Sequence, residues 1–240
     1  MIIGDRPASA CFAHPVGAKL VERIVALENC TQETITDIQI IGPSGSSYSA
    51  LNKVTGSPDQ WYENITWTPT QSQIGPNILC AIATSSSLLA SDLSCFTVLV
   101  GITDPQIISA SPFGVLSDSF AYSSSGFLSF NIAFNVQILK PTKPAYIRIF
   151  SQTTNTEVYK VDASTISAAN FQKNNLILNI PVGTLSPDKY YVLFDYGVGL
   201  GTEYCNPISE QITDKTFWNL EIVQLTTTTM PTTSNVFILS

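Results

Sequence analysis

Short runs of β-branched and aromatic residues, separated by Gly, Pro, Asn and Ser, restrict the fold of this sequence more than any other feature. No apolar stripe with a helical period continues over a helical length. The alternation of a strand is clearest around Asn64, which falls on the face opposite to Trp61 and Trp67. The sequence therefore predicts an all-β protein.

Two groups of strands are expected, one in each half of the chain. The first group covers Leu20–Glu28, Thr34–Ile41, Gln60–Thr68, Ile78–Thr84 and Cys95–Val100. The second group covers Gln106–Ala110, Gly126–Phe134, Ala145–Phe150, Glu157–Val161, Asn175–Ile180, Tyr190–Asp195 and Thr216–Leu225. The second group has the number of short strands that a Greek-key sandwich needs, whereas the first has fewer.

The Gly101–Pro105 segment follows the last strand of the first group and opens a new pattern, which is typical of a short linker. We therefore expect one sandwich in residues 1–101 and a second in residues 102–225. Residues 226–240 form a Thr-rich extension that ends in an apolar strand.

The composition favours an extracellular protein. Hydrophobic residues make up 44% of the 240 residues and charged residues only 12%, so Ser, Thr, Asn and Gln must cover much of the surface. A net charge of −7 gives no electrostatic footprint for nucleic acid or an anionic membrane. The chain contains no apolar run of spanning length, and its first residues do not read as a signal peptide, so we expect a mature chain or a fragment.

The five cysteines predict disulfides formed in an oxidising compartment, because no CxxC pair accompanies them and the chain has a single His. Cys80 and Cys95 flank a Ser-rich loop between adjacent strands, so we expect them to be bridged. Cys11 and Cys30 are the expected second pair. Cys205 is then either a buried free thiol, which we favour, or is linked to Cys11, Cys30 or another chain.

Glycosylation is expected at two sequons and in the Thr-rich extension. Asn29-Cys30-Thr31 and Asn64-Ile65-Thr66 match the N-linked acceptor pattern, and a glycan on Asn64 would point away from the core. The candidates for O-linked sugars are Thr226, Thr227, Thr228 and Thr229.

No pattern supports catalysis, a cofactor or a metal site. His14 is the only His, and no Gly-x-Ser-x-Gly elbow accompanies it. Gly42–Gly45 reads as a turn, since its spacing fits neither an elbow nor a phosphate loop. We therefore expect a protein that is not an enzyme.

A turn that feeds an aromatic strand resembles the tyrosine corner of Ig-like and fibronectin-type sandwiches. It runs from Leu185 to Tyr191, and Tyr191 is the expected corner residue.

The second half also resembles the Ig-like domain family of bacterial surface-layer proteins. The residues that carry this resemblance are Phe134–Asn135, Tyr190–Asp195, Gly197–Val198 and Ile212–Trp218. The loop Gly199–Pro207 departs from that family, since it carries Cys205 in place of an Asp-x-x-Gly-Asn type turn.

The first half resembles, more loosely, secreted invertebrate Ig-like repeats. The matching residues are Trp67–Thr70, Gly75, Leu79–Ala81 and Ser91–Val100. The two resemblances together imply two tandem Ig-like (Greek-key) β-sandwiches with a role in secretion, adhesion or scaffolding.

The apolar strand at the end of the sequence permits three readings. It consists of Val236, Phe237, Ile238 and Leu239, and it follows a spacer, Thr226–Asn235, that can span at most about 33 Å. It can pack as the last strand of its own sandwich or form a tail. It can also be donated to a neighbouring subunit, where backbone hydrogen bonds give affinity and alternate side chains fill pockets.

Two hypotheses of function follow. In the first, the chain is a structural subunit of an extracellular glycosylated fibre, and the C-terminal strand of one protomer completes the first domain of the next. Such a head-to-tail homopolymer does not close on itself. In the second, the chain is a two-repeat fragment of a larger cell-surface adhesion or recognition ectodomain. A natural terminus at Ser240 favours the fibre, and a further repeat after it favours the ectodomain.

Overall fold

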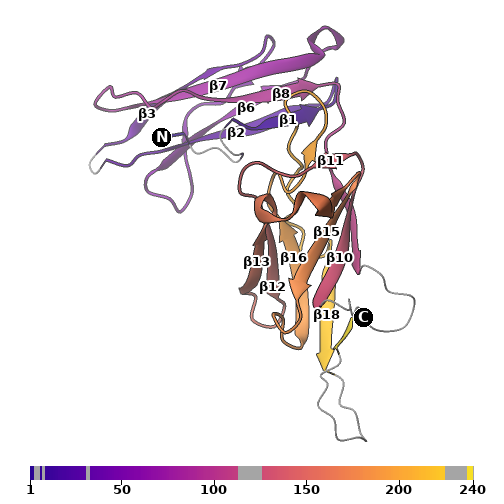
Figure 1. Ribbon diagram of the computed structural model, residues 1–240. Coiled ribbons are helices and arrows are strands. Elements are labelled where there is room, and N and C mark those ends of the chain that lie inside the picture. Colours follow the sequence, from indigo (N-terminus) through magenta and orange to yellow (C-terminus); the bar gives the residue numbers. More distant parts are fainter. Residues whose placement is uncertain (3–5, 7–8, 31–32, 113–125, 225–236, 240) are drawn as a thin grey trace, which may run out of the picture. The chain divides into compact units, whose positions relative to one another are not determined.

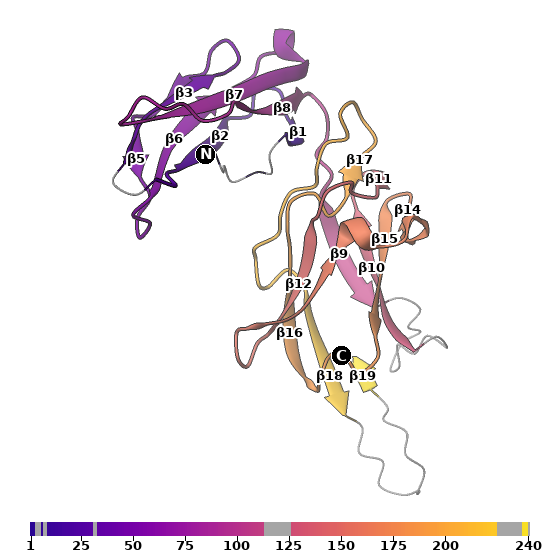
Figure 2. The same cartoon turned by 60° about the vertical axis from the view of Figure 1, so that its left-hand side comes forward.

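The protein is all-β, as a computed structural model shows (Figures 1 and 2). The structure describes residues 1–2, 6, 9–30, 33–112, 126–224 and 237–239. It divides into two compact units. Unit 1 contains Met1–Asp104 together with Glu203–Pro207, and unit 2 contains Pro105–Thr202 and Ile208–Ser240. The division therefore falls within the Gly101–Pro105 segment, but the Glu203–Pro207 loop groups with unit 1 and not with its neighbours in sequence.

Unit 1 is a sandwich of two sheets. Its strands are β1 (Cys11–His14), β2 (Leu20–Leu27), β3 (Ile35–Ile41), β4 (Ser47–Tyr48), β5 (Asn52–Lys53), β6 (Gln60–Trp67), β7 (Gly75–Ser85) and β8 (Ser94–Val100). One sheet has the order β1-β8-β7-β3, and the other has the order β2-β6-β4, with β5 also paired to β6. A one-turn 3₁₀ segment, Gln71–Gln73, precedes β7.

Unit 1 has more strands than the sequence predicted. The extra ones are β1, β4 and β5, which have two to four residues each and are too short to show a period of two. The expectation of an incomplete first sandwich is therefore wrong. The alternation along β6 is as expected, since Ile65 and Trp67 are buried and Asn64 lies on the opposite face.

Unit 2 is a second sandwich. Its strands are β9 (Ile107–Pro112), β10 (Phe127–Phe134), β11 (Ile138–Leu139), β12 (Tyr146–Ser151), β13 (Glu157–Asp162), β14 (Phe171–Gln172), β15 (Asn175–Pro181), β16 (Asp188–Phe194), β17 (Leu200–Gly201), β18 (Asn219–Gln224) and β19 (Phe237–Leu239). The main sheets have the orders β14-β15-β10-β9 and β13-β12-β16-β18-β19, and β11 pairs with β17. Short 3₁₀ segments at Ala163–Thr165 and Ala168–Asn170 join β13 to β14.

Aromatic rings fill the centre of unit 2. The ring of Trp218 lies 5.2 Å from that of Phe130 in an edge contact and 6.0 Å from that of Phe194 in a stacked one. Phe130 belongs to one sheet and Phe194 to the other, so Trp218 joins the two layers. The residues of this buried cluster supply the alternating apolar pattern from which the sequence predicted a sandwich in the second half.

The tyrosine corner is made by Tyr190 and not by Tyr191. The Tyr190 hydroxyl donates a hydrogen bond to the backbone carbonyl of Ser186, and its ring is buried. Tyr191 points to the other face of β16, where it stacks on Phe150 and donates to Asn155 Oδ1 at 2.8 Å. The expectation of Tyr191 is wrong because β16 alternates its faces, which places the core with Tyr190, Val192 and Phe194.

Candidate functional site

A disulfide joins the two strands that flank the Ser-rich hairpin of unit 1. Cys80 on β7 and Cys95 on β8 are bonded and are direct partners in the antiparallel ladder, which matches the expected pairing. Their Cα atoms lie 4.1 Å apart, as in a pair whose backbone groups do not bond to each other. The backbone N–H and C=O of Cys95 therefore point away from β7, toward the side of the sheet where β1 lies.

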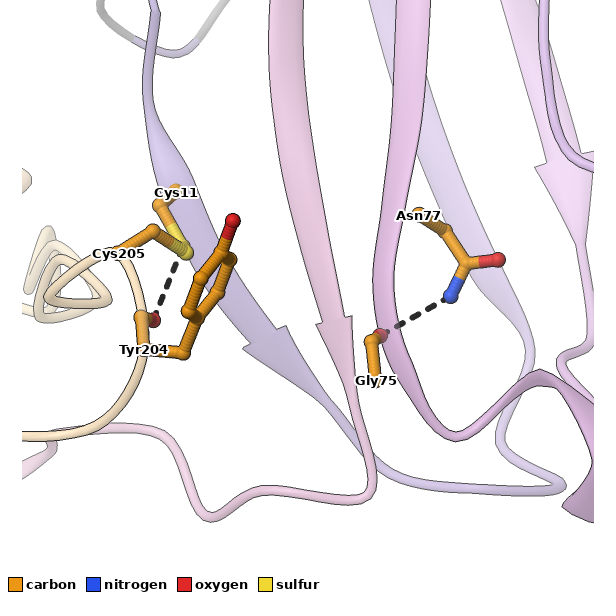
Figure 3. Close-up of a disulfide and its surroundings, with 5 residues drawn as sticks. All are labelled: Cys11, Gly75, Asn77, Tyr204 and Cys205. Carbon is orange, nitrogen blue, oxygen red and sulfur yellow. Dashed lines mark hydrogen bonds between the residues drawn. A yellow bond between two sulfur atoms is a disulfide. The ribbon is translucent and has the colours of Figure 1, made fainter.

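The second disulfide joins Cys11 to Cys205, so the expected Cys11–Cys30 pair is wrong (Figure 3). Cys205 is thus not the free thiol that we favoured, and Cys30 is the free, exposed cysteine. Cys11 Sγ also lies 3.9 Å from the carbonyl oxygen of Tyr204, a close contact and not a hydrogen bond, because a disulfide sulfur has no proton. The pairing connects residues 194 positions apart, and sequence spacing offers no signal for such a link.

The edge of β8 is only partly covered. β1 runs parallel to β8 and pairs with Thr97–Val100, and the Thr97 N–H donates to the Ala10 carbonyl at 2.8 Å. Ser9, the residue before Ala10, has a φ of 58°, which is a left-handed conformation and not that of an extended strand. Among the described residues, no strand pairs with Ser94–Phe96 on this side of β8.

An open groove of about 540 Å³ lies at this uncovered edge, and we call it the β8 groove. One side is the turn and strand start that run through Leu93 to Cys95. The other side is formed by the N-terminal residues, where Ile2 bridges Ala26 of β2. Its full lining is Met1, Ile2, Ser9, Ala90, Ser91, Asp92, Leu93, Ser94 and Cys95. The groove thus offers backbone groups, short polar side chains and apolar side chains together.

A smaller groove of about 180 Å³ lies next to it and shares Met1, Ala90 and Ser91 with the β8 groove. Glu33 lines it and accepts a hydrogen bond of 2.7 Å from the Ser87 hydroxyl. Hydrogen bonds from Ser87 and then Ser85 lower the pKa of the Glu33 carboxyl. This groove is therefore polar and carries an ionised carboxylate at neutral pH.

Three leucines of the same hairpin are exposed. The exposed fractions are 84% for Leu88, 64% for Leu89 and 58% for Leu93. Leu93 lines the β8 groove and Leu89 lines the smaller groove, whereas Leu88 lines neither. Apolar side chains beside an open strand edge favour pairing with another chain unless they are covered.

Sequence reasoning missed both grooves. Their walls come from three segments that are distant in sequence, namely the N-terminal residues, the β2–β3 connection and the β7–β8 hairpin. A signal did exist in the run of exposed leucines within a Ser-rich loop, which is unusual for a simple turn.

The C-terminal strand pairs within its own unit. Phe237–Leu239 forms β19 at the edge of a sheet, antiparallel to β18, with Ile222 opposite Leu239 and Gln224 opposite Phe237 (Figure 2). This is the first of the three readings of the segment. Val236 and the candidate O-glycosylation residues Thr226, Thr227, Thr228 and Thr229 lie outside the described residues.

The two sequons lie on the surface of unit 1. Asn29 is exposed and lines the smaller groove beside Cys30. Asn64 is half-buried on the outer face of β6, where its backbone N–H donates to the Ser49 hydroxyl oxygen at 2.9 Å. N-linked glycans at either site would project away from the core.

The described residues include no cluster of three His, Cys, Asp or Glu that could hold a metal ion. His14 lies at the end of β1, and its Nε2 is 3.0 Å from the Ala18 carbonyl oxygen. Within the ranges that the structure covers, no helix is long and apolar enough to cross a membrane.

Comparison with known proteins gives no family. No family model and no curated protein matches the chain. Among solved structures, the sialic acid binding region of a Streptococcus sanguinis SK1 adhesin, bound to 3'sLn, is 9% identical with a TM-score of 0.32, over 53% of this chain and 42% of that one. The fibronectin(III)-like modules of Clostridium thermocellum CbhA are 12% identical with a TM-score of 0.30, over 88% and 90% of the two chains.

Domains 4–9 of the surface layer protein SbsC are also 12% identical, with a TM-score of 0.28, over 92% of this chain and 32% of that one. TM-scores this low do not support any inference about function. The sandwich fold rests on the sheets and the buried clusters described above, and function must be inferred from the grooves, the disulfides and the C-terminal strand.

Proposed function

We propose that this chain is an extracellular structural subunit that assembles head to tail through its C-terminal strand. The observation that supports the proposal is the short, single pairing of that strand. β19 has three residues and pairs only with β18 among the described strands, and twelve residues (225–236) separate the two. A strand this short gives up few backbone hydrogen bonds when it moves to another chain.

An extracellular location is supported by two disulfides and by a surface poor in charged residues. Cross-links of this kind persist outside the reducing cytosol. Sugars on Asn64, Asn29 or the Thr run would be compatible with that location and would coat an assembled fibre.

The geometry of donation decides the form of the assembly. A strand donated from one copy to a different surface of the next makes a heterologous contact, which generates open filaments unless the rotation between copies closes a ring. Backbone hydrogen bonds would give the affinity of this contact, and alternate side chains would give its specificity. The pairing of β19 with β18 is then the resting position of the strand in an isolated subunit.

The experiment that tests this proposal compares the full chain with a version that ends after Leu225. We expect the full chain to sediment as large species and to form regular filaments in negative-stain electron microscopy, while the shortened chain stays monomeric. A matched control replaces Thr226–Thr229 by Ser and keeps the strand, so it should assemble like the full chain. Monomers in all three samples would reject assembly through the strand.

The second candidate function is a two-repeat piece of an adhesion or recognition ectodomain. The observation that favours it is the hairpin with Leu88, Leu89 and Leu93 exposed beside two grooves, a surface suited to a partner. Under this reading the full chain stays monomeric, and intact-mass measurement of the native protein shows polypeptide that continues beyond Ser240. A native mass that ends at Ser240 would argue against it.

A further inference from the structure

We infer that the β8 groove is the acceptor for the C-terminal strand of the next copy. This inference rests on the proposed function and identifies the surface that receives the strand. The occupant is the segment Val236–Leu239 of a second chain. Three observations on unit 1 support this choice: a strand edge that has no partner among the described residues, a groove of suitable chemistry beside it, and exposed leucines.

The backbone of β8 is oriented to receive a strand. Cys80 and Cys95 face each other closely, so the N–H and C=O of Cys95 point away from β7. Thr97, two residues further on, points the same way, because its N–H bonds to the Ala10 carbonyl of the segment that enters β1. Two independent contacts therefore agree that the Cys95 backbone groups face the β8 groove. Among the described residues, no strand pairs with this part of β8 on that side.

The lining of the groove suits an apolar strand. A strand of four residues is about 13 Å long and directs alternate side chains to one face. Leu93, Ala90 and Ile2 offer apolar surface to those side chains. The polar groups of the lining, such as Ser91 and Ser94, lie in the same groove and suit the polar backbone of the incoming strand.

The edge of β18 is a weaker acceptor for a second chain. If β19 of one copy replaced β19 of another, the same hydrogen bonds and packing would form again between two chains, so nothing would offset the entropy cost of association. The intramolecular pairing is also favoured by the high effective concentration that a short tether provides. The β8 groove offers interactions that the isolated chain does not make, including cover for Leu93, and these can drive assembly.

Mixing two complementary full-length variants tests the inference. Leu93→Asp damages the acceptor and keeps the donor strand, whereas Phe237→Asp damages the donor and keeps the acceptor. We expect each variant alone to remain monomeric. Their mixture should form one-to-one heterodimers that do not grow, because each pair has only one working strand and one working groove. Sedimentation velocity measures the masses directly.

Matched variants separate the possible failures. Leu88→Asp charges a leucine of the same hairpin that is more exposed than Leu93 and lies outside the groove, so this variant should assemble as the unchanged chain does. Ser94→Trp fills the groove without adding charge and should block assembly as Leu93→Asp does. Thermal unfolding close to that of the unchanged chain establishes that each variant folds.

The outcomes differ for the two proposals. Assembly of both groove variants, with Phe237→Asp remaining monomeric, would overturn the acceptor and leave the donated strand standing. Assembly of Phe237→Asp would overturn both. Two folded variants that give no heterodimer when mixed would also overturn the acceptor.

Discussion

The two units reach a similar sandwich by different means. In unit 2, a single cluster of 21 buried residues joins both sheets, with Trp218 and several phenylalanines at its centre. In unit 1, one cluster of the described residues has 8 members, three of them alanines, and further buried side chains, among them Phe12, Trp67 and Val98, lie outside it. Both disulfides of the described residues lie in unit 1.

The comparison shows what apolar burial and cross-links each contribute. Apolar burial stabilises both sandwiches, and in unit 1 the two disulfides add to it by reducing the freedom of the unfolded chain. Unit 1 also carries exposed leucines and a strand edge that has no partner among the described residues, and these features offer a surface to another chain.

The largest expected effect is in the core of unit 2. Trp218→Ala removes the ring that contacts Phe130 and Phe194 and should lower the free energy of unfolding of unit 2 by about 3–5 kcal/mol. Calorimetry should show the transition of unit 2 shifted to lower temperature. Trp218→Phe should have a smaller effect, and an equal loss from both variants would contradict a role for ring packing.

The next effect is confined to unit 1. Cys80→Ser combined with Cys95→Ser opens a bridge between residues 15 positions apart and should cost about 3 kcal/mol. In a Trp218→Phe background, the remaining tryptophans, Trp61 and Trp67, lie in unit 1, so their fluorescence follows its unfolding in urea. An unchanged midpoint would show that the bridge does not stabilise unit 1.

A smaller effect distinguishes the two neighbouring tyrosines of unit 2. Tyr190→Phe removes the hydrogen bond to the Ser186 carbonyl and should cost about 1 kcal/mol. Tyr191→Phe keeps the stacking on Phe150 and loses the bond to Asn155 Oδ1, which still accepts a hydrogen bond from Lys215 Nζ, so this variant should cost less. Chemical denaturation of both variants checks the order, and a reversed order would contradict the larger contribution expected from the Tyr190 hydrogen bond.

The smallest effect depends on pH and lies in unit 1. Glu63 faces the core on β6, and burial, followed by the nearby carboxylate of Asp37, raises its pKa. A carboxyl group with a raised pKa binds its proton more tightly in the folded state, so its contribution to stability is lost as the pH rises through that pKa. Glu63→Gln should therefore stabilise unit 1 at neutral pH and have no such benefit below the ordinary pKa of about 4.3. Thermal unfolding at both pH values measures the change in stability. An equal increase in stability at both values would show that ionisation of Glu63 is not its cause.

The sequence predicted those features that depend on local pattern. The alternation around Asn64, most strands of both units and the Cys80–Cys95 bridge follow from periodicity or from residues close in sequence. Features that depend on contacts over long separations were missed or misassigned. The Cys11–Cys205 bridge joins a short strand to a distant loop, and the β8 groove lies between the N-terminal residues and the β7–β8 hairpin. Neither contact has a periodic signature.

Amide hydrogen exchange, read by mass spectrometry on assembled and monomeric chain, tests the donated strand most directly. If the C-terminal strand leaves β18 and enters the β8 groove of the next copy, assembly should slow exchange in Ser94–Phe96 and speed it in Asn219–Gln224. Unchanged exchange in Ser94–Phe96, together with continued protection of Asn219–Gln224, would contradict donation to the β8 groove.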